Sequence, residues 1–100
     1  MTEQNQEQFY IVRTDRAGVF FCNIAKRNGG FLKITNARKV FYWSGAAAVE
    51  QLAMEGTKNQ KECKLTMTVP ELEVAGAIQI IPCTDVAVKS LSGVAEWKIK

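Results

Sequence analysis

The chain has 100 residues, of which 47% are hydrophobic and 23% charged, and its formal net charge is +3. This length corresponds to one domain, and the balance of apolar and charged residues excludes an intrinsically disordered chain. No apolar run approaches the roughly 20 residues that cross a bilayer, which excludes a membrane-spanning helix. The sequence has no histidine and no close pair among its three cysteines, so we expect no metal site and no cofactor.

The first eight residues, MTEQNQEQ, have neither the basic start nor the apolar stretch of a secretion signal. We interpret residues 1–8 as a flexible polar tail and residues 9–100 as a single α+β domain. An odd number of cysteines with apolar neighbours is a poor disulfide framework and is typical of a reducing compartment. We therefore expect a cytoplasmic protein with no membrane partner.

Positive charge is concentrated in one part of the chain. Residues 9–40 hold seven lysines and arginines against a single acid. Such a basic half favours an anionic partner, for example a nucleotide, a nucleic acid or an acidic protein. The alternative is that these charges only keep strand faces and hairpin tips in water.

Runs of aromatic and β-branched residues predict four short strands, at residues 9–14, 19–25, 31–35 and 38–43. Turn residues separate them, most clearly at Asn28-Gly29-Gly30 and again at Asn36-Ala37. The second strand is apolar on both faces, so we expect it to be central or covered twice. Tight connections of this kind predict an antiparallel meander.

A short alanine-rich helix is expected next, with Ser44 as its N-cap, Gly45 as its first residue and Gly56 as its stop. The elements predicted after it are strands at 62–69, 74–81 and 96–99 and a second helix at 85–91. Pro70 is expected to close the first of these strands, and Thr84 to cap the helix. The predicted fold class is therefore α+β, with a strongly bent, partly barrel-like antiparallel sheet of about six or seven short strands and one or two short helices.

The most promising region for ligand binding is the junction between the fourth strand and the first helix. It would offer aromatic rings for stacking, a hydroxyl and the free N–H groups of a helix N-terminus, which suit an anion. Arginines can hold phosphates with two hydrogen bonds each. The predicted ligand-binding residues are Arg13, Arg16, Asn36, Arg38, Tyr42, Trp43, Ser44 and Gly45. Because adjacent strand residues point to opposite faces, we expect one of Tyr42 and Trp43 to be inside and the other exposed.

Catalysis has less support in the sequence. Without histidine, no base accompanies a serine or cysteine in a recognisable spacing. Cys83 precedes a predicted helix N-terminus, where the pKa of a thiol can fall, but its apolar neighbours favour a structural role. The Asn28-Gly29-Gly30 stretch lacks the spacing and the lysine of a phosphate-binding loop. We therefore predict a protein that is not an enzyme.

Several motifs resemble a small family of proteins of unknown function found in phages and prophages. The resemblance extends over nearly the whole chain from Phe9 and is most specific in five stretches. These are Val12-Arg13-Thr14, Ala17-Gly18-Val19-Phe20, Asn36-Ala37-Arg38, Tyr42-Trp43-Ser44-Gly45-Ala46 and Ile81-Pro82-Cys83-Thr84. The chain departs from the family pattern at Cys22, where a glycine is common. The resemblance implies a phage accessory protein that acts in the cytoplasm of the bacterial host.

Three hypotheses for function follow. The first is a non-catalytic protein that sequesters an anionic ligand, namely a nucleotide-derived immune signal of the host. The second is a small barrel-like protein that binds nucleic acid through its basic strands, and the third is an inhibitor or structural protein that binds a host or phage protein. Under each of them we expect a homo-oligomer, because Met54, Met67 and Trp97 would add exposed apolar surface.

Overall fold

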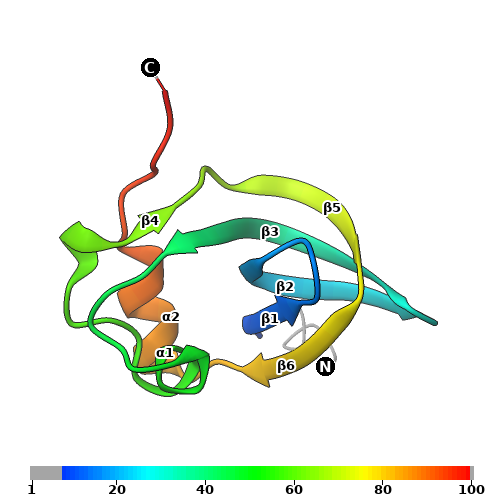
Figure 1. Ribbon diagram of the computed structural model, residues 1–100, viewed down its shortest axis with the longest axis horizontal. Helices are drawn as coiled ribbons and strands as arrows, with labels where there is room; N and C mark the ends of the chain where they lie inside the picture. The colour runs from blue at the N-terminus through cyan, green and yellow to red at the C-terminus, as the bar shows by residue number, and fades with distance from the viewer. Residues whose placement is uncertain (1–7, 100) are drawn as a thin grey trace.

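The computed structural model describes residues 8–99 and has the predicted α+β fold, with six strands in one bent, unclosed antiparallel sheet and two short α-helices (Figure 1). The strands are β1 (Tyr10–Thr14), β2 (Val19–Asn28), β3 (Phe31–Tyr42), β4 (Lys64–Leu65), β5 (Val69–Ala75) and β6 (Ala77–Pro82). The helices are α1 (Val49–Glu55) and α2 (Asp85–Ser92), with a short 3₁₀ helix, η2 (Gln60–Glu62), before β4. Most of the predicted polar tail lies outside the described residues.

Gly76 joins the two edges of the sheet. The strand order is β4-β3-β2-β1-β6, and β5 also pairs with β3, so consecutive strands β5 and β6 lie at opposite edges. Gly76 has a φ of 76°. Its N–H donates to the carbonyl of Gly30 at 3.3 Å, and its own carbonyl accepts from the N–H of Asp15 at 2.8 Å. The strand predicted over 74–81 is therefore two strands, because the positive φ turns the chain between them.

β3 is one long strand, and the turn predicted at Asn36-Ala37 is wrong. Asn36 has a φ of 48°, and the β2–β3 register shifts beside it, so it is the extra residue of a β-bulge. Its side chain donates to Asn23 Oδ1 at 2.7 Å, and Asn23 donates in turn to the carbonyl of Gln8 at 2.7 Å. The bulge bends β3 so that its first half pairs with β5 and its second half with β4.

Pro70 lies inside β5 and does not close the strand predicted over 62–69. β5 pairs only with β3, and the pairs Thr35–Glu71 and Ala37–Val69 place Pro70 opposite the bulge at Asn36. A proline lacks the N–H of an ordinary ladder residue, so an edge strand opposite a bulge tolerates it. The predicted last strand, 96–99, is also wrong: within the described residues this segment contributes only an isolated bridge between Glu96 and Leu65.

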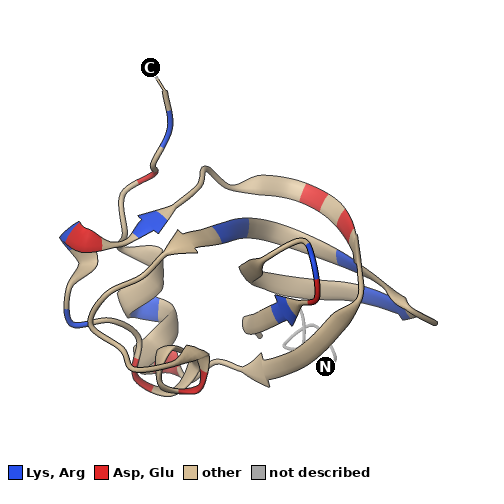
Figure 2. Cartoon of the chain, viewed as in Figure 1, with Lys and Arg blue, Asp and Glu red and all other residues tan. Residues whose placement is uncertain are grey.

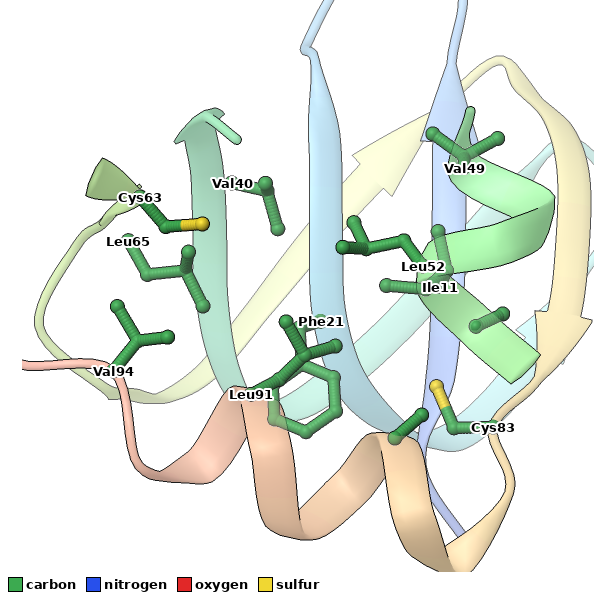
Figure 3. Packing of buried hydrophobic residues seen from close by; sticks show 12 residues of the cluster. Ile11, Phe21, Val40, Val49, Leu52, Cys63, Leu65, Cys83, Leu91 and Val94 are labelled. Carbon is green, nitrogen blue, oxygen red and sulfur yellow. The ribbon is translucent and has the colours of Figure 1, made fainter. Parts of the chain in front are cut away.

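The sheet is covered on both faces, as the apolar pattern of β2 predicts. Phe21 of β2 faces α1 and α2, and a cluster of twelve buried residues fills this space (Figure 3). Its neighbours Phe20 and Cys22 belong to a second cluster on the other face, where β5 bends over the sheet. Alternate residues of one strand therefore supply two cores, which explains why so short a chain buries an aromatic residue on each face.

Helix α1 begins four residues later than predicted, at Val49. Gly45 has a φ of 85°, which is not helical, and the carbonyl of Ser44 accepts a hydrogen bond from the hydroxyl of Thr57. The N-cap is Ala48, which has no side-chain cap, and the Gln51 side chain accepts a hydrogen bond at 2.7 Å from the N–H of Ala47, just before the helix. The expected stop at Gly56 is confirmed by its φ of 75°.

The second helix matches its prediction closely. Thr84 is the N-cap of α2, and its hydroxyl accepts from the N–H of Ala87 at 3.1 Å. The same hydroxyl donates to the carbonyl of Met54 at 2.6 Å, and the N–H of Thr84 donates to Ala53 at 3.1 Å. One threonine therefore caps α2 and fastens it to the end of α1.

Arg38, which the sequence predicts as a phosphate ligand, is buried and binds backbone carbonyls of its own chain. Its side chain is only 6% exposed. Nε donates to the carbonyl of Thr66 at 2.8 Å, and the terminal nitrogens donate at 3.3 Å each to the carbonyls of Leu91, Leu65 and Ala95. Burial lowers the pKa of the guanidinium, and the charge of Glu96 opposes that shift. Arg38 therefore ties β3 to β4, α2 and the C-terminal segment, and its donors are not directed at a ligand.

All three cysteines are free and buried, as their apolar neighbours predict. Burial raises the pKa of the Cys22 thiol from 9.0 to about 12, and the nearby Cys83 adds to this shift. Burial raises the pKa of Cys83 to about 12 as well. A thiol with so high a pKa is protonated near neutral pH and is a poor nucleophile, which contradicts the reactive alternative for Cys83.

We expect the free energy of unfolding to fall as the pH rises from about 9 to about 12, the interval between the ordinary and the folded-state pKa of Cys22 and Cys83. In this interval the unfolded thiols lose protons that the folded thiols keep, so rising pH favours the unfolded state. Each thiol accounts for at most about 1.4 kcal/mol per pH unit. Urea unfolding under reducing conditions measures the slope. The double variant Cys22→Ala/Cys83→Ala should lose stability less steeply with pH, and equal slopes in the two proteins would contradict this account.

We expect Arg38→Ala to lower the free energy of unfolding by about 2 to 4 kcal/mol, because it leaves buried carbonyls without a donor. Arg38→Lys should lie between this variant and the parent, since one ammonium cannot reach all four carbonyls. Urea unfolding is again the measurement. Arg16→Ala is the matched control, because the Arg16 side chain is 94% exposed and its loss should change stability little. Indistinguishable stabilities of the Arg38→Ala and Arg16→Ala proteins would exclude a structural role for the guanidinium.

Candidate functional site

The predicted ligand-binding residues lie in several parts of the fold. Asn36 and Arg38 come together, and both line a small pocket of about 140 Å³. The polar groups of both are engaged within the protein, Asn36 with Asn23 and Arg38 with backbone carbonyls. Ser44 and Gly45 lie against the loop after α1, where a Cβ on Gly45 would approach the Thr57 hydroxyl to 2.6 Å. A helix N-terminus at Ser44 and Gly45, on which the predicted anion site depended, is absent because α1 begins at Val49.

Tyr42 and Trp43 behave as their alternation predicts. Tyr42 is 52% exposed, whereas Trp43 is half-buried and packs against the core beneath the helices. Tyr42 is therefore the ring that a ligand can reach. Phe41 beside it is also exposed and stacks on Trp97, with 4.7 Å between the ring centroids.

Arg13 and Arg16 each lie beside an acid of this chain. Arg13, in β1, contributes to lowering the pKa of Glu50, although the larger cause is the hydrogen bond of 2.8 Å that Gln79 donates to Glu50. Arg16 lies in the β1–β2 turn, with its Nε 3.9 Å from the carboxylate of Asp15. These positions do not form the phosphate clamp that the sequence suggests.

The β2–β3 hairpin gathers ligand-binding groups more closely than the predicted residues do. Across the hairpin Lys26 pairs with Lys33 and Asn28 with Phe31, and Lys33 also pairs with Glu73 of β5. Side chains of residues directly opposite each other lie on the same face of an antiparallel sheet. We call these five residues, Lys26, Asn28, Phe31, Lys33 and Glu73, the hairpin face.

The hairpin projects from the rest of the sheet because β2 is longer than its neighbour β1. β1 pairs with residues 19–22 of β2, whereas pairing between β2 and β3 continues to the turn. Every residue from 25 to 31 is exposed. Gly29, with a φ of 61°, provides the left-handed conformation that a two-residue turn requires. Figure 2 shows Lys and Arg along this projecting hairpin and acids on the neighbouring part of β5.

The hairpin face carries mixed charge, with Lys26 and Lys33 beside Glu73. Lys26 and Lys33 are directly opposite each other, and like charges in this position destabilise a strand pair. The Nζ of Lys33 makes one ion pair, with Glu71 at 3.2 Å, and both side chains are well exposed. An anion between the two ammonium groups would relieve their repulsion.

The five residues of the hairpin face line a pocket of about 290 Å³. Phe31 is 55% exposed and takes no part in either core. Two cations and an amide suit a phosphate, and an exposed ring suits the face of a nucleobase. The carboxylate of Glu73 can accept a hydrogen bond from an amino group of the base.

The sequence contained two signals for this site that the prediction did not combine. The Asn28-Gly29-Gly30 hairpin was identified, and so was the excess of cations in residues 9–40. Phe31 directly follows the Gly29-Gly30 turn, and a side chain at the tip of a hairpin cannot reach the core. Its place in the sequence therefore indicates an exposed aromatic ring. The pairing of Lys26 with Lys33 follows from the two-residue turn at Gly29-Gly30, because the bulge between Ile24 and Lys26 shifts the register only farther from the turn.

Residues 8–99 contain neither a cluster of metal ligands nor a membrane-spanning helix. In this part of the chain no three His, Cys, Asp or Glu residues gather as a metal would require. No helix within the described residues is long and apolar enough to cross a bilayer.

Comparison with known families identifies one match. A family model described as a domain of unknown function (DUF6948) matches residues 7–91. No curated protein and no solved structure matches the chain. The match confirms the expected membership of a family of unknown function, while a phage origin stays a prediction. With the model matching well over half of its length, this chain belongs to the DUF6948 family.

Proposed function

We propose that this protein is a non-catalytic binding protein for single-stranded nucleic acid, which it holds on the hairpin face. The observation that carries the proposal is the directly opposed Lys26–Lys33 pair beside the exposed ring of Phe31. Proteins that bind single strands combine cations along the backbone with aromatic side chains on which bases stack. The hairpin face has both within one pocket.

The non-catalytic part of the proposal is supported by the nucleophiles that the fold buries. Cys22 and Cys83 have a raised pKa, and the sequence has no histidine to serve as a general base. The exposed groups of the hairpin face are ammonium, amide, phenyl and carboxylate groups. This set suits recognition by charge and stacking.

A second candidate is the capture of a single nucleotide, including the nucleotide-derived immune signal that a phage accessory protein would sequester in the cytoplasm of its bacterial host. The hairpin-face pocket, about 290 Å³, is of the size of one nucleotide. This candidate has less support than it had from sequence, because Arg38 is engaged by backbone carbonyls. The polymer is favoured because the pocket lies open on a projecting hairpin, where a chain of nucleotides can continue past it.

Fluorescence anisotropy with a labelled single-stranded oligonucleotide tests the proposal. We expect the affinity to fall as salt rises, because bound phosphates release counterions. Lys26→Ala should weaken binding and reduce the slope of log K against log salt by about 0.7, the value for one lost phosphate contact on a single strand. Phe31→Ala should weaken binding about tenfold or more, within the range for loss of one stacked base.

Two control variants distinguish binding at the hairpin face from attraction by other exposed cations and aromatic rings. Lys89→Ala removes one exposed cation from α2, and Phe41→Ala removes an exposed ring at the opposite end of β3. Both should bind like the parent protein. Equal losses in Lys26→Ala and Lys89→Ala would refute the hairpin face. Binding of a mononucleotide as tightly as the oligonucleotide would favour the second candidate.

A further inference from the structure

A groove along β5 adjoins the pocket of the hairpin face and shares one residue with it, Glu73. It has a volume of about 470 Å³ and lies between β5 and the β1–β2 turn. Its apolar lining includes Ala17, Phe20, Leu72 and Val74, and its charged lining consists of two acids, Asp15 and Glu73, and one cation, Arg16. Side chains of both strand faces take part, which places the groove along the edge of the strand.

This edge of β5 has free backbone groups. β5 pairs with β3 on one side only. The N–H of Gly76 points toward β3, since it donates to Gly30. Backbone groups alternate in direction along an antiparallel strand, so those of Glu71, Glu73 and Ala75 point away from β3, toward the free edge. Such an edge is a template for an added strand.

The C-terminal segment offers a strand of matching chemistry. Trp97 anchors it, with its N–H donating to Leu65 at 2.9 Å and its ring stacked on Phe41. Beyond Trp97 the chain leaves the body of the protein (Figure 1). Ile99 is 99% exposed, so it packs against none of the described residues 8–99, and Lys98 forms an ion pair with its neighbour Glu96 at 3.3 Å.

We propose that the C-terminal segment of one copy lies along the β5 groove of a second copy. Ile99 enters the apolar floor beside Phe20 and Val74, and Lys98 lies toward the carboxylates of Asp15 and Glu73. A second copy is the occupant that this chain itself indicates, because the exposed Ile99 complements the apolar floor and Lys98 complements a rim in which two acids outnumber one cation, Arg16. The self-association expected from sequence thereby gains a defined interface.

The geometry sets the strength and symmetry of this contact. Extended chain advances about 3.3 Å per residue, so Lys98 and Ile99 together span about 7 Å of the groove edge and make a small contact. Small interfaces of this kind are weak and depend on concentration. If two copies exchange segments reciprocally, the contact closes as a dimer, whereas a one-way exchange would continue as an open chain.

Sedimentation velocity of the full chain over a wide concentration range tests the proposal. We expect the parent protein to associate as its concentration rises. Ile99→Asp should raise the dissociation constant about tenfold or more, and it should leave the fold intact because Ile99 is fully exposed. Lys98→Glu and Asp15→Lys should each weaken association, and combining them should restore it. Glu62→Lys, a similar charge reversal on η2, is the control and should associate like the parent.

A parent protein that stays monomeric at every concentration would overturn the proposal. Association that survives both Ile99→Asp and Asp15→Lys would overturn it too, because another surface must then be responsible. The proposal does not rest on nucleic-acid binding. Ile99 and Asp15 lie outside the hairpin face, so the anisotropy and the sedimentation experiments can fail independently.

Discussion

The guanidinium of Arg38 holds together segments that are distant in the sequence. It donates to carbonyls of Leu65, Thr66, Leu91 and Ala95, which belong to β4 and the residue after it, α2 and the C-terminal segment. A buried cation is costly unless its donors are satisfied, and here the last carbonyls of a helix and the end of a short strand need donors of their own. The guanidinium needs acceptors and these carbonyls need donors, and the hydrogen bonds of Arg38 satisfy both. The sequence predicts that Arg38 binds an anionic ligand, but the hydrogen bonds of its guanidinium instead stabilise the fold.

The bulge at Asn36 decides how the sheet can carry binding surfaces. It bends β3 so that β5 and β4 share one edge of the same strand, and it provides the position opposite which Pro70 fits in β5. At Gly76 the chain turns from β5 into β6, which pairs with β1. The edge of β5 that faces away from β3 has no strand beside it among the described residues. The projecting hairpin and the open groove are both consequences of this bent, incompletely closed sheet.

The predicted site residues are dispersed in the fold, while the proposed site lies elsewhere, mostly in the same half of the chain. Cations and aromatic rings of the first half do lie on the surface, but at Lys26, Phe31 and Lys33 on the hairpin face. The junction at Ser44 and Gly45 was misassigned because a serine before alanines is a common N-cap signal. Contacts of Ser44 with the loop after α1, made by residues such as Thr57, delay the helix to Val49. Local signals cannot report such contacts, since the partners are more than ten residues away.

Periodicity and turn chemistry were sufficient to predict the fold class, the two-sided burial of β2, the hairpin at Gly29-Gly30 and the Thr84 cap. Each of these features has a signal in residues that are neighbours in the sequence. The tertiary structure alone decided the continuity of β3, the division of β5 from β6 and the burial of Arg38. These depend on register and on partners far along the chain. A single inserted residue, such as the bulge at Asn36, changes which side chains face each other without changing the local pattern of apolar residues. The same holds for function: composition indicates an anionic partner, and the pairing of strands determines which cations are left to meet it.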